Sequence, residues 1–182
     1  MTFRSTTPPP RPQDAKRDDR SAVLRAMGLD GPDPNLDEFA RRLAREAGTP
    51  YAMVNIFGSG EQQFLGLCTP DEHSIFPSVG RSMSLDHGFC PEVVERRNAL
   101  VLPDVFASPR FASNAVVDLI NIRTYAGAPL IHHTGVVLGT VCFVGPQEQP
   151  TSTGQASLVL IKQQRDEVMN YLYRRAGNQP PQ

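Results

Sequence analysis

Residues 125–144, YAGAPLIHHTGVVLGTVCFV, contain two apolar runs that flank a short polar connection closed by Gly135. Two apolar runs joined by a few residues that include glycine are typical of a β-hairpin. Gly135 can adopt the positive φ angle that such a connection usually needs. Neither face of either run is polar, and a sheet that is apolar on both faces must be covered on both faces. This stretch therefore predicts the centre of a three-layer domain.

Three residues inside these runs, Gly127, Pro129 and Gly139, are unusual for strand interiors. Glycine and proline within strands mark bulges or positions where another backbone or a ligand comes close. We expect one of these features beside them.

The composition is that of a soluble protein with one domain. The 182 residues carry a formal net charge of −1, and 40% of them are hydrophobic. This balance excludes the clustered basic surface of a nucleic-acid binder. The sequence shows neither an apolar run of about 18–20 residues that could span a bilayer nor a signal peptide, which predicts a cytoplasmic protein without a membrane partner. The three cysteines, Cys68, Cys90 and Cys142, are widely spaced, which disfavours a disulfide framework and structural zinc.

The chain divides into a proline-rich tail (1–20), a folded domain (21–175) and a polar tail (176–182). Neither tail has enough apolar residues to form a core, so both are expected to be flexible. Within the domain, a helix is expected from Asn35, which forms a capping box with Glu38, to Gly48. Strands are expected at 51–57 and 61–68.

Residues 69–123 form a long, irregular connection, called the insert below. It is expected to contain a helix that starts near His87 or Pro91 and is capped by Asp86, then a short strand at 99–102 and a short helix within 104–121. Ser152 and Gln155 predict the start of a final helix that runs to about Arg174. This order predicts an α+β fold with helices on one face of an antiparallel sheet and the insert on the other.

Four segments resemble the GAF domain family, of the kind found upstream of histidine kinases and diguanylate cyclases or standing alone in bacteria. They are LDEFARRLAREAGTPYAMVNIF, GFCPEVVERRNALVLPDVFASPRFASNAVV, IRTYAGAPL and GVVLGTVCFV, in the family's order. The resemblance covers residues 21–175. It implies a GAF/PAS-like sheet of about six strands and a pocket between the sheet and the insert. It implies no catalytic residue, since most GAF domains bind ligands or signal.

The candidate ligand-binding residues lie on the expected pocket wall or at its mouth. They are Arg81, Phe89, Cys90, Asp104, Phe111, Arg123, Tyr125 and Cys142. Arginine forks favour carboxylate or phosphate, so Arg81 and Arg123 are candidates to hold an anionic ligand. Asp104 either contacts the ligand or pairs with Arg110 to pin the loop.

The cysteines and histidines leave alternatives open. Cys90 lies at an expected helix start, where a thiol can be reactive, or it is a small packed residue. Cys142, within a strand, favours the packed interpretation. His132 and His133 are expected on an exposed turn, whereas His87 is kept as a haem or metal ligand candidate. No metal site is predicted, and the sequence names no cofactor.

The leading function is a sensory or regulatory module that binds a small molecule or senses redox state. Its output is expected in a partner protein, because no kinase, cyclase or DNA-binding segment follows Arg175. One alternative is a thiol redox enzyme resembling the free methionine sulfoxide reductases among GAF proteins, although their closely spaced cysteines are missing. Others are a chromophore or haem carrier and an interaction module with a vestigial pocket.

A homodimer is expected through the terminal helices, because apolar residues recur at helical spacing in the last one. They are Leu158, Ile161, Val168 and Leu172. Such a stripe can form a seam between subunits, or it packs on the sheet of its own chain.

Overall fold

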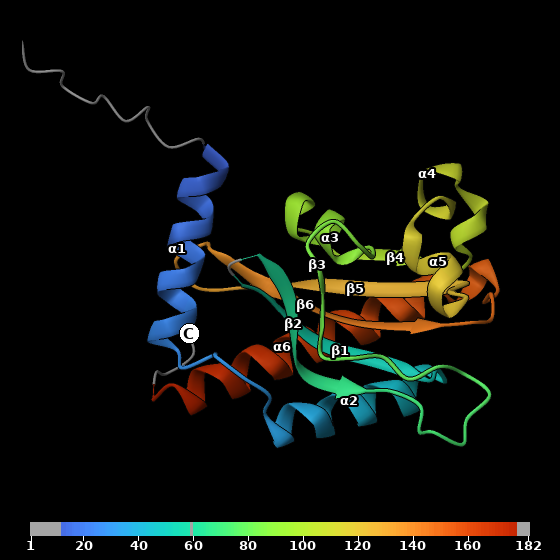
Figure 1. Cartoon of the computed structure of the whole chain (residues 1–182), viewed down its shortest axis with the longest axis horizontal. Helices are drawn as coiled ribbons and strands as arrows, with labels where there is room; N and C mark the ends of the chain where they lie inside the picture. Colours follow the sequence, from blue (N-terminus) through green and yellow to red (C-terminus); the bar gives the residue numbers. More distant parts are fainter. Residues whose placement is uncertain (1–11, 59, 178–182) are drawn as a thin grey trace, which may run out of the picture.

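The computed structural model describes residues 12–58 and 60–177. A six-stranded antiparallel sheet, ordered β3-β2-β1-β6-β5-β4, separates two layers of other structure (Figure 1). The strands are β1 (Tyr51–Phe57), β2 (Glu61–Cys68), β3 (Ser82–Ser84), β4 (Leu100–Leu102), β5 (Thr124–Ile131) and β6 (Val137–Gly145). The predicted α+β class and the antiparallel sheet are confirmed.

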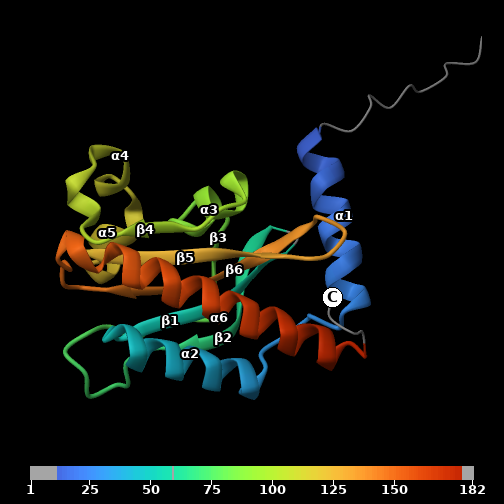
Figure 2. The same ribbon diagram turned by 180° about the vertical axis from the view of Figure 1, so that it is seen from behind.

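The helices fall into a terminal set and an insert set. The terminal helices are α1 (Pro12–Ala26), α2 (Pro34–Ala47) and α6 (Gly154–Arg175). The insert carries α3 (Cys90–Arg96), α4 (Pro109–Ala112) and α5 (Ala115–Ile120), with a 3₁₀ turn at Val105–Ala107. Figure 2 shows α2 and α6 on one side of the sheet, α3, α4 and α5 on the other, and α1 across one end. No helix in the described ranges is long and apolar enough to cross a membrane.

The central hairpin forms as the sequence predicts. β5 pairs with β6 from Thr124↔Gly145 to Ile131↔Val137. In the turn, the Gly135 N–H donates to the His132 carbonyl at 2.8 Å, and Gly135 has a φ of 87°. His132, however, is buried, because its ring lies 3.9 Å from that of His133 and 5.7 Å from that of Tyr173, centroid to centroid. The prediction that both histidines are exposed is wrong for His132.

The two faces of the sheet bury separate cores. On one face, Ala126, Ala128 and Leu130 of β5 pack in a cluster with residues of α2 and α6. On the other face, Tyr125 packs with residues of the insert, including Phe89 and Val116. Successive strand side chains point to opposite faces, so the all-apolar hairpin needs both covers.

The first helix begins inside the stretch that was expected to be a tail. α1 starts at Pro12, within the stretch expected to be a flexible tail, and its end is anchored by the buried side chains of Leu24 and Met27. The residues between Pro12 and Leu24 are mostly Gln, Asp, Ala, Lys and Arg, several of which favour helix. A proline at the first helical position costs little stability. Residues 1–11 and 178–182, where the remaining tail predictions fall, lie outside the described residues.

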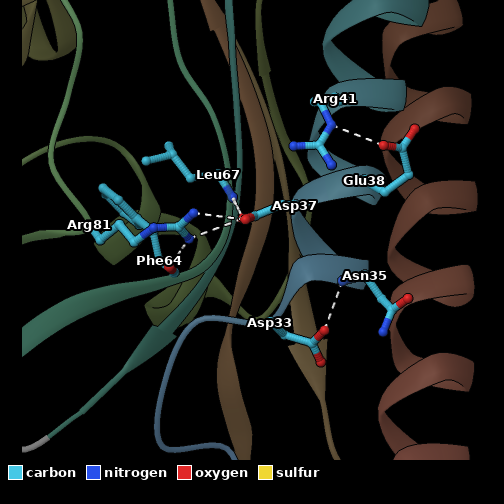
Figure 3. A network of polar contacts seen from close by, with 8 residues as sticks. All are labelled: Asp33, Asn35, Asp37, Glu38, Arg41, Phe64, Leu67 and Arg81. Carbon is cyan, nitrogen blue, oxygen red and sulfur yellow. Dashed lines mark hydrogen bonds and ion pairs between the residues drawn. The ribbon is translucent and has the colours of Figure 1, made fainter.

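The expected helix caps are wrong in detail. α2 is capped by Asp33 rather than Asn35, because the Asp33 carboxylate accepts the Asn35 N–H at 2.9 Å (Figure 3). α3 has Phe89 at its N-cap instead of Asp86. A 3₁₀ turn at Thr151–Thr153 precedes α6, which has no side-chain cap bond, so the capping box expected there does not form. A capping pattern marks the neighbourhood of a helix start more reliably than the turn that opens it.

The apolar stripe of α6 packs within its own chain. Ile161, Val168 and Leu172 are fully buried against the sheet and α2. These three residues are therefore not available as the seam of a homodimer, and the homodimer itself stays a prediction.

Candidate functional site

A small cavity lies between the sheet and the insert, with a volume of about 40 Å³. One water needs about 10–15 Å³ of such volume, so the cavity holds only a few atoms in this conformation. No residue that lines it carries a formal charge. The sheet contributes Met53, Asn55, Gln62, Phe64, Met83, Tyr125, Cys142 and Val144, and the rest of the insert contributes Gly88, Phe89, Cys90, Val116, Ile120 and Ile122.

Two cysteines meet at the wall of this cavity. The Cys90 and Cys142 sulfurs are 3.7 Å apart, and both residues are buried free thiols. The Tyr125 hydroxyl lies 3.4 Å from the Cys90 sulfur, and the Met53 sulfur lies 3.9 Å from that of Cys142. Cys90 is the first residue of α3, whereas Cys142 is in the middle of β6. The sheet and the insert thus place together two thiols that their spacing in the sequence does not connect.

The shared hydrogen bond gives the two thiols different acidities. The Cys142 thiol beside Cys90 lowers the pKa of Cys90 to about 7, although burial acts in the opposite direction. The neighbouring side chains of Thr140, Tyr125 and Asn55 also lower this pKa. The same Cys90 partner, together with burial, raises the pKa of Cys142, and burial raises that of Tyr125. Near neutral pH, Cys90 is therefore the thiol that ionises, and thiolates are the nucleophilic form.

A buried amide pair forms the floor beside the thiols. The Asn55 side-chain amide donates to Gln62 Oε1 at 2.8 Å, and Gln62 donates in turn to the carbonyls of Ser84 and His87 at 2.7 and 2.8 Å. These bonds tie the insert to β1 and β2.

Two polar atoms of this floor, Asn55 Oδ1 and Thr140 Oγ1, are buried without a hydrogen-bond partner. The two residues face each other across the β1–β6 pair. A buried polar atom without a partner costs about 1–3 kcal/mol. Neither residue was identified from the sequence. Each is a polar residue inside an otherwise apolar strand, and that pattern could have pointed to them.

Four of the eight predicted site residues line the cavity: Phe89, Cys90, Tyr125 and Cys142. Phe111 lies behind this wall, where its ring packs edge-on against Phe89 with centroids 5.9 Å apart.

Arg81 is directed to the other side of the sheet edge. It binds the Asp37 carboxylate through two nitrogens, at 3.0 and 2.8 Å, and donates to the Phe64 carbonyl at 3.3 Å (Figure 3). Asp37 also accepts the Leu67 N–H at 2.8 Å. Arg81 therefore fastens the segment before β3 to α2, and it is not among the residues that line the cavity.

Arg123 also has carboxylate partners of its own. It pairs with Asp104 at 3.2 Å and with Glu148. Arg110 pairs instead with Glu92, so the predicted ion pair between Asp104 and Arg110 is wrong. The loop that contains Asp104 is held in place, but by Arg123, the residue just before β5. Arg81 and Arg123, the two candidates for holding an anionic ligand, therefore both lie outside the cavity lining.

The structure offers little support for a metal centre at His87. Within residues 12–58 and 60–177, no three or more His, Cys, Asp and Glu side chains come close enough together to hold a metal ion. The backbone carbonyl of His87 serves the amide floor.

Comparisons with known proteins agree with this architecture. A family model described as GAF domain matches residues 32–162. A cyclic di-GMP phosphodiesterase from Pseudomonas aeruginosa is 29% identical over 139 residues, which are 75% of this chain. The match spans only 22% of that relative's length.

Two solved structures have similar folds. The GAF domain of a phosphoenolpyruvate-protein phosphotransferase from Acinetobacter has a TM-score of 0.58 at 12% identity, with 88% of this chain and 94% of that chain covered. A free methionine-R-sulfoxide reductase from Neisseria meningitidis, solved with its substrate, has a TM-score of 0.58 at 14% identity, with 93% and 95% covered. At such identities the likeness concerns the fold alone.

Proposed function

The chain belongs to the GAF domain family, and on this premise we propose that it is a sensory module that binds a small uncharged molecule in the cavity between sheet and insert. GAF domains form a family of sensory modules, and the proposed signal passes to a partner protein. The observation that carries the proposal is a pair of unpartnered buried atoms, Asn55 Oδ1 in the lining of a mainly apolar cavity and Thr140 Oγ1 opposite it on the neighbouring strand. Apolar pockets with a few polar groups are the usual form of a ligand site.

The lining argues for a neutral ligand. A buried charge without a partner is costly, and the cavity offers no charged side chain to offset it. Cyclic di-GMP, the substrate in the name of the Pseudomonas relative, carries two phosphates and is much larger than 40 Å³. We therefore propose that this cavity does not bind such a nucleotide and that the domain has a regulatory role.

The insert is the proposed moving part. α4 buries none of its side chains, and Leu119 of α5 is 67% exposed. A segment with few buried apolar contacts opens at low free-energy cost. A ligand that prefers the open or the closed insert would shift this equilibrium and change the surface that a partner reads.

Several features remain proposals. We propose that the domain extends from α1 to α6, that the protein is cytoplasmic, and that any homodimer uses a surface other than the buried stripe of α6. A second candidate function, thiol redox chemistry in the same cavity, is favoured by the 3.7 Å separation of Cys90 and Cys142.

The test is ligand-dependent thermal stability. The purified protein is analysed by native mass spectrometry for bound molecules and then melted with a panel of small neutral metabolites. Val116→Phe fills the cavity from α5 and is expected to abolish the rise in melting temperature, while the exposed Leu119→Phe on the same helix should preserve it. If no molecule binds the wild type, or Val116→Phe responds equally, the interaction module with a vestigial pocket replaces this proposal.

A further inference from the structure

Cys90 and Cys142 are the one pair of described cysteines within contact distance, with sulfurs 3.7 Å apart at the wall of the cavity. We propose that this pair is a modification site for hydrogen peroxide, which enters the cavity, oxidises Cys90 and leaves a Cys90–Cys142 disulfide. The inference rests on the proposed sensor function and deepens it by naming the small molecule. Oxidation of the cysteines is measured separately from ligand binding. The oxidation proposal can therefore fail while ligand binding in the cavity is still observed.

The geometry requires only a small movement. A disulfide brings its sulfurs to about 2.05 Å, so the gap must close by less than about 2 Å. Cys142 is held between β1 and β5, where it pairs with Met53 and Gly127. Cys90 belongs to α3 in the insert, so rotation of its side chain and a shift of α3 close the gap. The bond would thus fasten the insert to the sheet.

The reaction balances with the groups present and one peroxide. The Cys90 thiolate attacks one oxygen of hydrogen peroxide, so that an S–O bond forms, the O–O bond breaks and hydroxide leaves. The neighbouring Cys142 thiol donates its proton to that hydroxide, which becomes water. The Cys142 thiolate then attacks the Cys90 sulfur, so that the S–S bond forms and the second hydroxide leaves and takes a proton from solvent. Two sulfurs are oxidised by one electron each, and the peroxide is reduced to two waters.

The surroundings of Cys90 suit the first step. The Tyr125 hydroxyl, 3.4 Å away, can donate a hydrogen bond to the thiolate. The neighbouring Thr140 also lowers the pKa of Cys90, and its buried hydroxyl has no hydrogen-bond partner, so it is free to turn toward the thiolate. The groups that titrate around Cys90 are Cys142 on β6 and Tyr125 on β5, and no Asp, Glu, Lys or Arg side chain lines the cavity.

The cavity also selects the oxidant. A volume of about 40 Å³ admits hydrogen peroxide, which is little larger than water, but not a hydroperoxide with an aromatic group. The uncharged lining disfavours anionic oxidants. We therefore expect hydrogen peroxide to react much faster than cumene hydroperoxide, although the two share the same O–O chemistry.

Cys68 provides an internal control. It lies at the end of β2, is partly exposed, and its sulfur has no other cysteine among its hydrogen-bond partners. Burial raises the pKa of its thiol. An oxidation governed by exposure alone would reach Cys68 before the buried pair.

The experiment treats the reduced, full-length protein with a small excess of hydrogen peroxide, blocks the remaining thiols and maps tryptic peptides by mass spectrometry. We expect the peptides that contain Cys90 and Cys142 to be joined, with Cys68 still blocked as a thiol. Cys142→Ser should instead trap a dimedone-reactive sulfenic acid on Cys90, Cys90→Ser should abolish the reaction, and Cys68→Ser should leave it unchanged. Cumene hydroperoxide should react at least about tenfold more slowly, as expected for a thiolate whose reactivity depends on access.

The outcomes that overturn the proposal are equally direct. Oxidation of Cys68 before the pair, or a pair that stays reduced in the folded protein, contradicts it. Equal rates for native and urea-unfolded protein would show that the site contributes nothing. Should a serine variant fail to fold, Tyr125→Phe serves instead, because it retains both thiols. It is expected to slow the hydrogen peroxide reaction several-fold while the joined peptide still forms, and an unchanged rate would remove Tyr125 from the site.

Discussion

A Cβ atom added to Gly139 would lie 1.9 Å from the backbone oxygen of Asn55. At Gly139, β6 therefore passes β1 with no room for a side chain, directly beside the pair Asn55 and Thr140, of which Asn55 lines the cavity. This contact confirms the expectation that a glycine inside the hairpin marks a close approach of another backbone.

Gly139→Ala is expected to destabilise the protein by more than about 2 kcal/mol, because the strands must separate to admit a methyl group into a packed core. The measurement is urea unfolding followed by circular dichroism. Gly80→Ala is the matched control, since its Cβ would meet nothing within 4 Å and its φ is not in the left-handed region. A similar free energy of unfolding for the two variants would contradict the close approach.

The sheet was the part that local patterns could predict. The bounds of β1 and β2 and the turn at Gly135 follow from alternation and glycine placement, which act within a few residues. β3 has only three residues and pairs solely with β2. Three residues are too few to show the alternation by which a strand is recognised in a sequence.

The site was predictable only in part, because its contacts join distant segments. Cys90 and Cys142 followed from a family resemblance, and Phe89 and Tyr125 from the expectation that the insert covers an apolar sheet face. The approach of two thiols from α3 and β6 depends instead on how the insert packs. The same holds for Arg81 and Arg123. Their residue type predicted anion binding, but the carboxylates that they bind come from α2 and from the loop after β6, which spacing does not reveal.

Asp33→Asn should destabilise the protein by about 1–2 kcal/mol at neutral pH, because Asn can still cap α2 but lacks the negative charge that Asp33 presents to Tyr171 and Arg175. The Asp33 carboxylate accepts the Tyr171 hydroxyl at 2.7 Å and lies 3.6 Å from Arg175, so it also joins α2 to α6. Burial alone would raise the pKa of Asp33, but the hydrogen bonds from Tyr171 and the Asn35 N–H, with the charge of Arg175, lower it overall.

A lowered pKa in the folded state fixes the sign of the pH dependence. The stabilisation by Asp33 is fully present above the pKa of the unfolded chain, about 3.8, and is lost as the pH falls through the lower folded value. The difference between wild type and Asp33→Asn in urea unfolding should therefore shrink as the pH is lowered below about 3.8. Asp30→Asn, an exposed neighbour, is the control. A difference independent of pH would mean that the charge contributes nothing.

Arg81→Gln should lower stability modestly, by about 1 kcal/mol or less, since its ion pair with Asp37 is partly exposed. It should leave ligand binding and the reactivity of Cys90 unchanged, because Arg81 lies outside the cavity lining. Thermal melts and peroxide reaction rates measure the two effects separately. If the variant lost ligand binding at unchanged stability, Arg81 would have to be part of the ligand-binding site after all.

The ionisation of Cys90 offers the most direct test of the site's electrostatics. Thiolates absorb near 240 nm, so a pH titration of the folded protein should show a transition with a midpoint near 7 that is absent in Cys90→Ser. Cys142→Ala removes the strongest hydrogen-bond donor to the thiolate and should move the midpoint toward the ordinary value of about 8.5. Tyr125→Phe removes a weaker donor, so its midpoint should lie between those of the wild type and Cys142→Ala. If both variants titrate like the wild type, these hydrogen bonds do not set the acidity of Cys90, and the argument that Cys90 attacks the peroxide first loses its basis.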